Sequence, residues 1–262
     1  MLVCGIDVGA RTAKAVLMVD GEIAGHSVIR SGPGSAVAAL AAALETTTLR
    51  REDIEFTVAT GYGRVVVPFA QRNVTEIACH AKGNHYFFPR VRTILDMGGQ
   101  DCKAIRCDEA GKVATFLMND KCAAGTGRSL EVMASLLQVR LEDLGQLALE
   151  ASGKPEKISN TCVVFAKSEV LALARQGVPT REILAGLCEG VAERVKGLLR
   201  VVGVEEDFVI SVGISKNVGV VRRIEEKLGV MSHICFEPQI VGALGAALFA
   251  RGFLERTGPN GR

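Results

Sequence analysis

LVCGIDVGARTAK, the stretch Leu2–Lys14, predicts a buried strand, a glycine turn that contains an aspartate, and then a second strand. The pair Asp20-Gly21 follows that second strand and is typical of a hairpin turn. The stretch Thr93–Lys103, TILDMGGQDCK, repeats the order of strand, aspartate, glycine turn and strand. This repeat predicts an α/β protein with two similar lobes, which we expect at residues 1–90 and 91–262.

Sequence patterns predict the elements around the two repeats, and the helices near Ser129–Leu137, Val163–Ala174 and Ile183–Val201 show amphipathic spacing. Helices are expected near Ala36–Thr46, Glu76–Phe87, Ser129–Leu137, Val163–Ala174, Ile183–Val201 and Ile240–Ala250, strands near Ile54–Thr60 and Phe208–Gly213, and a frayed tail at Gly258–Arg262.

Composition excludes several classes of protein. The chain has 262 residues, 48% of them hydrophobic, which is enough for a large buried core. Its net charge of +2, with both signs interspersed, favours neither nucleic acid nor an anionic membrane as partner. The first residues lack the pattern of a signal peptide, and no apolar run is long enough to span a membrane, so we expect a cytoplasmic protein.

An aspartate and glycine at the end of a strand have a defined chemical use. Backbone amides at glycine can approach phosphate oxygens without a Cβ in the way, and the carboxylate can hold hydrated magnesium. Two such turns could grip one nucleoside triphosphate, and Val212–Asn217 supplies a third glycine turn, from strand to helix. The chain has neither a P-loop nor the glycine fingerprint of dinucleotide-binding proteins.

The eight cysteines divide into two kinds. Cys122 and Cys162 each stand where a loop turns into a helix, which suggests a metal cluster beside the nucleotide site. In a reducing compartment the others are expected to be thiols that pack as small hydrophobic side chains. These are Cys4, Cys79, Cys102, Cys107, Cys188 and Cys235.

Several motifs are similar to those of one ATPase superfamily. Asp7–Thr12 resembles the first phosphate motif of the actin, sugar-kinase and heat-shock-chaperone superfamily, Asp96–Asp101 its second phosphate motif, and Val212–Asn217 its adenosine motif. Within it, the chain resembles the activators of 2-hydroxyacyl-CoA dehydratases and the ATP-binding subunits of benzoyl-CoA reductase. The matches to this branch are Thr60–Arg64, Glu76–Ala81, Asn119–Arg128, Thr161–Glu169 and Pro238–Ala247.

The resemblance implies an actin-like, ribonuclease-H-like fold, with duplicated mixed-sheet lobes and a nucleotide cleft between them. It also implies roles for single residues in binding ATP or ADP. We expect hydrated magnesium at Asp7 and Asp96, phosphate contacts at Gly9, Thr12, Lys14, Gly98 and Gly99, a water-orienting group at Gln100 or Asp101, and adenosine near Gly213 and Asn217.

The resemblance further implies that Cys122 and Cys162 bind a [4Fe-4S] cluster. Such a cluster normally takes four thiolates, so two cysteines per chain require a second chain, as on the twofold axis of a homodimer. Gly125 and Gly127 would let the backbone approach the cluster. ATP hydrolysis would then drive a low-potential electron, received from a ferredoxin or flavodoxin, into a partner iron-sulfur enzyme such as a 2-hydroxyacyl-CoA dehydratase.

Three departures from the family pattern leave alternatives open. Arg11 replaces a small hydroxyl residue, Val212 replaces a glycine, and Lys167 stands where many dehydratase activators have an acidic residue. The alternatives are a benzoyl-CoA reductase subunit in a heterodimer of similar chains, and a reductase of a double-cubane-cluster protein. A small-metabolite kinase of the same fold and a purely regulatory ATP-binding module are rivals from other classes, although neither needs cysteines at two helix starts.

Overall fold

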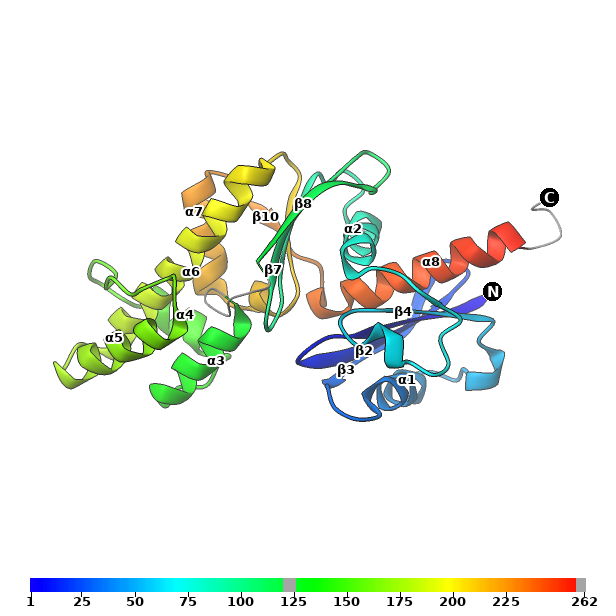
Figure 1. The fold of residues 1–262 in the computed structure, drawn as a ribbon, viewed down its shortest axis with the longest axis horizontal. Coiled ribbons are helices and arrows are strands. Elements are labelled where there is room, and N and C mark those ends of the chain that lie inside the picture. The colour runs from blue at the N-terminus through cyan, green and yellow to red at the C-terminus, as the bar shows by residue number, and fades with distance from the viewer. Residues whose placement is uncertain (120–125, 258–262) are drawn as a thin grey trace. The chain divides into compact units, whose positions relative to one another are not determined.

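The structure is a computed structural model that describes residues 1–119 and 126–257. The chain forms two compact units. Unit 1 comprises Met1–Arg90, Cys107–Val113 and the chain from Phe236 onward, and unit 2 comprises Val91–Arg106 and Ala114–Cys235. Each unit is built on one five-stranded sheet (Figure 1).

The sheet of unit 1 has the strand order β3-β2-β1-β4-β5. β1 pairs antiparallel with β2 and β2 with β3, whereas β1–β4 and β4–β5 are parallel, so the sheet is mixed. Asp20 and Gly21 have φ angles of 51° and 97° and form the predicted hairpin turn between β2 and β3. The strands are β1 Leu2–Val8, β2 Thr12–Val19, β3 Glu22–Arg30, β4 Phe56–Thr60 and β5 Arg72–Asn73.

Helices cover both faces of this sheet. The α-helices of unit 1 are α1 Ser35–Glu45, α2 Glu76–Phe87 and α8 Val241–Thr257. Alternate residues of β1 point to opposite faces, so that Cys4 and Ile6 pack with α1 and Val3 packs with α8. Figure 1 shows α1 and α8 on opposite sides of the strands. Because both faces of the sheet are buried, its central strands are almost wholly apolar.

Small residues explain why α8 belongs to unit 1, although the sequence analysis grouped residues 91–262 in one lobe. A Cβ added at Gly5 of β1 would overlap the carbonyl of Ala243, and one at Gly245 would overlap the carbonyl of Cys79 on α2. Backbones therefore touch directly where α8 crosses β1 and α2. Such contacts between distant segments leave no local pattern that could fix the boundary from sequence.

The sheet of unit 2 repeats that of unit 1 with the strand order β10-β9-β6-β7-β8. β6 and β7 form an antiparallel hairpin, and β6 pairs in parallel with β9, as β1 does with β4. The strands are β6 Thr93–Met97, β7 Cys102–Cys107, β8 Val113–Asn119, β9 Phe208–Ser211 and β10 Ser232–His233. The predicted duplication is therefore present in the strand order.

In the described part of unit 2, five α-helices accompany this second sheet: α3 Gly127–Leu136, α4 Leu144–Leu149, α5 Val163–Arg175, α6 Thr180–Val202 and α7 Val218–Leu228. Their apolar side chains form one core with β6, β7 and β9. Across residues 1–119 and 126–257, no helix combines the length and apolar content that crossing a bilayer requires. The predicted tail at 258–262 lies outside the described residues.

Candidate nucleotide-binding turns and cluster-bearing helices

The first aspartate turn joins β1 to β2. Asp7 and Lys14 face each other across the antiparallel pair, and Lys14 Nζ donates to Asp7 Oδ2 at 3.0 Å. Both residues are buried, 4% and 5% exposed, so the ion pair is shielded from water. The N–H of Gly9 donates to the carbonyl of Thr12 at 3.0 Å and closes the turn. Four predicted site residues of unit 1 thus lie together.

Two glycines pack against the Asp7 carboxylate. A Cβ at Gly61, just after β4, would overlap Asp7 Oδ1. A Cβ at Gly242 would lie 3.0 Å from Asp7 Oδ2 and 2.9 Å from His80 Nε2. Both glycines lie in the sequence motifs, but no role was predicted for them. They limit the orientation of Asp7 because a larger residue at either position would displace its side chain.

The second aspartate turn, between β6 and β7, is built in the same way. Lys103 lies opposite Asp96 in the strand register, with its Nζ 3.5 Å from Asp96 Oδ2 and 2.8 Å from Asp101 Oδ1. The N–H of Gly98 donates to the carbonyl of Asp101 at 3.0 Å, which reproduces the bond between Gly9 and Thr12. Each turn therefore has a glycine two residues after its aspartate and a lysine seven residues after it. That spacing could have identified Lys103 as the counterpart of Lys14, although no role was predicted for it.

The two turns have the chemistry that a hydrated magnesium ion and phosphates require. Magnesium is held through one or two carboxylates, often across water, together with substrate phosphates. Asp7 and Asp96 each place a buried carboxylate beside a glycine turn, and each already attracts a buried ammonium group. Gln100 is exposed in the second turn, and Asp101 is half-buried. The residue types, charges and burial of the two turns therefore fit the predicted hydrated magnesium ion and phosphates.

The start of α3 is bonded directly to the second aspartate turn. Gly127 N donates to the carbonyl of Gly98 at 3.1 Å, and Arg128 N donates to the carbonyl of Gly99 at 2.9 Å. The hydroxyl of Thr126, which is fully buried, also donates to the Gly99 carbonyl, at 3.1 Å. The segment that follows the predicted cluster ligand Cys122 is thus anchored on a predicted phosphate turn, a link that the sequence did not indicate.

Cys162 stands at the N-cap of α5, as the sequence predicted. Its carbonyl accepts the first helical hydrogen bond, from Ala166 N at 3.0 Å, and its side chain is half-buried. The first turn of α5 exposes Val164 and Phe165, 68% and 64%. Cys122 and Gly125 lie outside the described residues. In the described part of the chain, no three His, Cys, Asp or Glu side chains gather around a common metal position.

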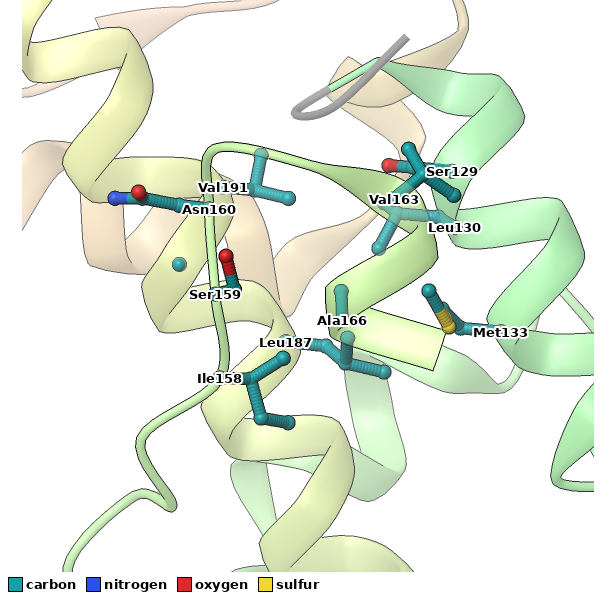
Figure 2. Close-up of a pocket in the computed structure, with 11 residues that line it drawn as sticks. Ser129, Leu130, Met133, Ile158, Ser159, Asn160, Val163, Ala166, Leu187 and Val191 are labelled. Carbon is teal, nitrogen blue, oxygen red and sulfur yellow. The ribbon is translucent and has the colours of Figure 1, made fainter. Parts of the chain in front are cut away.

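A small cavity lies among α3, α5, α6 and the segment 158–160. Its volume is about 30 Å³, which is enough for a water molecule. Figure 2 shows Leu130 and Met133 of α3 facing Val163 and Ala166 of α5, with the segment 158–160 on the other side. The helix after each predicted cluster cysteine therefore packs against the other, and the contact is incompletely filled.

The predicted adenosine turn combines an unusual backbone with a helix cap. Val212 has φ 69°, a conformation that is rare for a β-branched residue and ordinary for glycine, the residue that the family pattern led us to expect there. Gly213 begins a short 3₁₀ turn that leads into α7. Asn217 Oδ1 accepts a hydrogen bond from Val220 N at 3.0 Å and caps α7. In this geometry Asn217 acts as the N-cap of α7.

Burial accounts for most of the remaining cysteines, as expected. Cys4, Cys79 and Cys188 are buried, and desolvation raises the pKa of each thiol to about 12. Cys102 and Cys107 are also buried, whereas Cys235 is half-buried. A thiol kept protonated at neutral pH is a poor metal ligand and a poor nucleophile.

Comparisons with known proteins agree with this geometry. An activator of lactoyl-CoA dehydratase from Anaerotignum propionicum is 46% identical over 95% of this chain and 97% of its own. The structure of the activator of the 2-hydroxyisocaproyl-CoA dehydratase from Clostridium difficile, with bound ADPNP, superposes with a TM-score of 0.94 and 37% identity, over 98% of this chain and 97% of that one. A ROK family glucokinase from Streptomyces griseus, 15% identical over 96% of this chain and all of its own, shares only the fold, with a TM-score of 0.58.

The duplicated sheets, their paired aspartate turns and these superpositions define an ATPase of the actin-like fold. The family model for the BadF/BadG/BcrA/BcrD ATPase family matches residues 4–250. The chain belongs to this family, which confirms the resemblance found in the sequence motifs.

Proposed function

We propose that the chain is an ATP-hydrolysing activator that passes a low-potential electron to a partner iron-sulfur enzyme, a 2-hydroxyacyl-CoA dehydratase. The observation that carries this proposal is the bonding of residues 126–128 to Gly98 and Gly99. These residues follow Cys122 in the sequence, and a kinase has no need for a cysteine there. The relatives named as dehydratase activators support the choice of partner.

At the nucleotide, each aspartate turn contributes one carboxylate and a glycine turn at which no Cβ blocks the approach of a phosphate. We assign hydrated magnesium to Asp7 and Asp96, phosphate contacts to Gly9, Thr12, Lys14, Gly98 and Gly99, orientation of the attacking water to Gln100 or Asp101, and the adenosine side to Gly213 and Asn217. The ADPNP bound to the related activator supports a nucleoside triphosphate as the ligand.

For the redox site we propose Cys122 and Cys162 as ligands of one [4Fe-4S] cluster, shared between two subunits of a homodimer. When bound, such a cluster supplies a one-electron carrier whose potential depends on nearby charge, hydrogen bonds and solvent exposure. Cys162 fits because the unpaired N–H groups and dipole of α5 favour a negatively charged group. We assign to Gly125 and Gly127 the close approach of the backbone to the cluster. A ferredoxin or flavodoxin as donor and a cytoplasmic location complete the proposal.

Coupling between the two sites runs through the start of α3. A γ-phosphate that binds at the second turn and shifts its backbone also moves the carbonyls of Gly98 and Gly99, and these accept hydrogen bonds from Gly127, Arg128 and Thr126. Because α3 packs against α5, a shift of its first turn reaches both helices that follow the cluster ligands. The cavity between the helices leaves room for such a shift.

Thr126→Val tests this coupling. The variant keeps the shape of the side chain and removes the bond from the hydroxyl to the Gly99 carbonyl, which still accepts from Arg128 N, so the cost in stability is about 0.5 to 1.5 kcal/mol. We expect ATP hydrolysis within about twofold of wild type, whereas electron transfer per ATP falls about tenfold, the effect of losing about 1.4 kcal/mol of coupling. Electron transfer is measured with a one-electron acceptor under anaerobic conditions.

Two matched variants control for this test. Thr126→Ser retains the hydroxyl and should restore coupling. Ser129→Ala removes the neighbouring bond from Ser129 Oγ to the Thr126 carbonyl, 2.8 Å, without touching the phosphate turn, and should leave coupling intact. Equal losses in Thr126→Val and Ser129→Ala would mean that the helix start is merely structural.

The proposed function as a whole is tested by iron and sulfide analysis of anaerobically purified protein and by electron paramagnetic resonance after reduction. We expect about four irons and four sulfides per dimer and a signal that changes when ATP is added. A colourless, iron-free protein with normal ATP hydrolysis would refute electron transfer and favour a regulatory ATPase. Phosphate transfer to a small metabolite would favour the kinase.

A further inference from the structure

We propose that Lys103 is a built-in counter-cation that prevents Asp96 and Asp101 from holding a divalent metal ion until a nucleotide arrives. The proposal rests on the assignment of hydrated magnesium to Asp96. It adds an order of events to that assignment, in which metal and nucleotide enter the second turn together.

The two lysine sites differ in charge. Lys14 faces the single carboxylate of Asp7, so its pair is neutral. Lys103 lies within ion-pair distance of two carboxylates, at 2.8 Å and 3.5 Å, and the group of three carries a net negative charge. The turn of unit 2 therefore attracts an additional cation more strongly than the turn of unit 1.

Burial makes the ammonium of Lys103 hard to replace by solvent. Lys103 and Asp96 are 3% and 2% exposed, so water screens little of their attraction. Two carboxylates that approach the same ammonium so closely repel each other strongly once it is removed. A positive charge is needed between them, and in the nucleotide-free chain the lysine supplies it.

A bare divalent cation would have to displace this ammonium without offering it another partner. A metal–nucleotide complex brings phosphate oxygens that can accept the ammonium as the metal takes its place beside the carboxylates. The lysine side chain suits this exchange because its ammonium is a compact charge on a flexible four-carbon stem. Lys103 thus favours the metal–nucleotide complex over free metal.

The test measures metal binding by the full-length, cluster-containing protein without nucleotide. Mn²⁺ is the probe, and its free concentration is followed by electron paramagnetic resonance at room temperature. We expect no tight site in wild type and a gain of one site in Lys103→Met, with affinity raised at least about tenfold. The double variant Lys103→Met/Asp101→Asn, which removes one carboxylate, should lose the gained site.

Three further measurements make the result decisive. Lys14→Met, the matched change in unit 1, should gain less Mn²⁺ affinity because it leaves one carboxylate. Lys103→Gln repeats the test with a side chain that can still hydrogen-bond to both carboxylates, in case Lys103→Met does not fold. Binding of Mn²⁺ together with ADPNP to the wild-type protein tests the proposed function separately. If the wild-type protein did not bind this complex, the nucleotide site itself would be refuted.

The counter-cation role is overturned by either of two results. Nucleotide-free wild type could bind Mn²⁺ as tightly as Lys103→Met, which would show that the lysine does not exclude metal. Alternatively, folded Lys103→Met or Lys103→Gln could bind Mn²⁺–ADPNP and yet gain no affinity for Mn²⁺ alone.

Discussion

Replacing Cys162 with alanine is expected to abolish the iron-sulfur cluster while ATP binding and hydrolysis continue. Two thiolates per chain are needed to reach four in a homodimer, so losing one per chain removes half of the ligands. The fold should survive because Cys162 is half-buried and its side chain makes no cap hydrogen bond to α5. Iron and sulfide content per dimer, together with ATP turnover, measures the effect.

A matched variant separates this loss from general damage. Cys235→Ala alters another half-buried thiol of unit 2 that has no proposed role, and it should retain the cluster. Wild-type Cys162 should also resist alkylation while the cluster is bound and react after the iron is chelated. Full iron content in Cys162→Ala would remove this residue from the ligand set and, with it, the argument for a cluster shared between two chains.

The parts of the fold that sequence could predict are those specified by neighbouring residues. The hairpins β1–β2 and β6–β7 follow from strand patterns on either side of a glycine turn, and α2 lies where a helix was predicted. The assignment of α8 to unit 1 depends instead on glycine contacts between β1, α2 and α8. Such contacts join segments more than 150 residues apart, and single-sequence patterns do not record them.

The candidate site divides in the same way. Asp7 and Lys14 could be proposed from one short stretch, and the same spacing in the second stretch contained Lys103. The hydrogen bonds from the start of α3 to Gly98 and Gly99 could not be proposed from the sequence, because nothing in either segment specifies its partner. The packing of Gly61 and Gly242 against Asp7 is likewise visible only after the chain has folded. Sequence therefore identified the chemical groups, and structure supplied the connection between them.

Asp7→Asn is expected to have the opposite effect to Cys162→Ala, with ATP hydrolysis lost and the cluster retained. Removing the carboxylate removes a proposed support of hydrated magnesium, which stabilises the transferred phosphate by several kcal/mol, so hydrolysis should fall at least about a hundredfold. Asparagine preserves the size of the side chain between Gly61 and Gly242 and can still accept a hydrogen bond from Lys14.

The choice of asparagine matters because the ion pair of Asp7 with Lys14 is buried. Alanine would leave the ammonium without its carboxylate, at a cost of about 3 to 5 kcal/mol, and could unfold unit 1. Asp20→Asn is the control, since Asp20 is an exposed carboxylate of the same unit that pairs with the N-terminal ammonium. It should leave hydrolysis unchanged.

The pair of variants distinguishes two coupled sites from a single folding unit. ATP turnover, iron content and thermal unfolding are measured on Asp7→Asn and Cys162→Ala side by side. Opposite patterns of loss, with similar unfolding temperatures, support separate nucleotide and redox sites. If each variant lost both ATP turnover and iron in proportion to its unfolding, the residues would act through stability, and the coupling through α3 would have no two sites to connect.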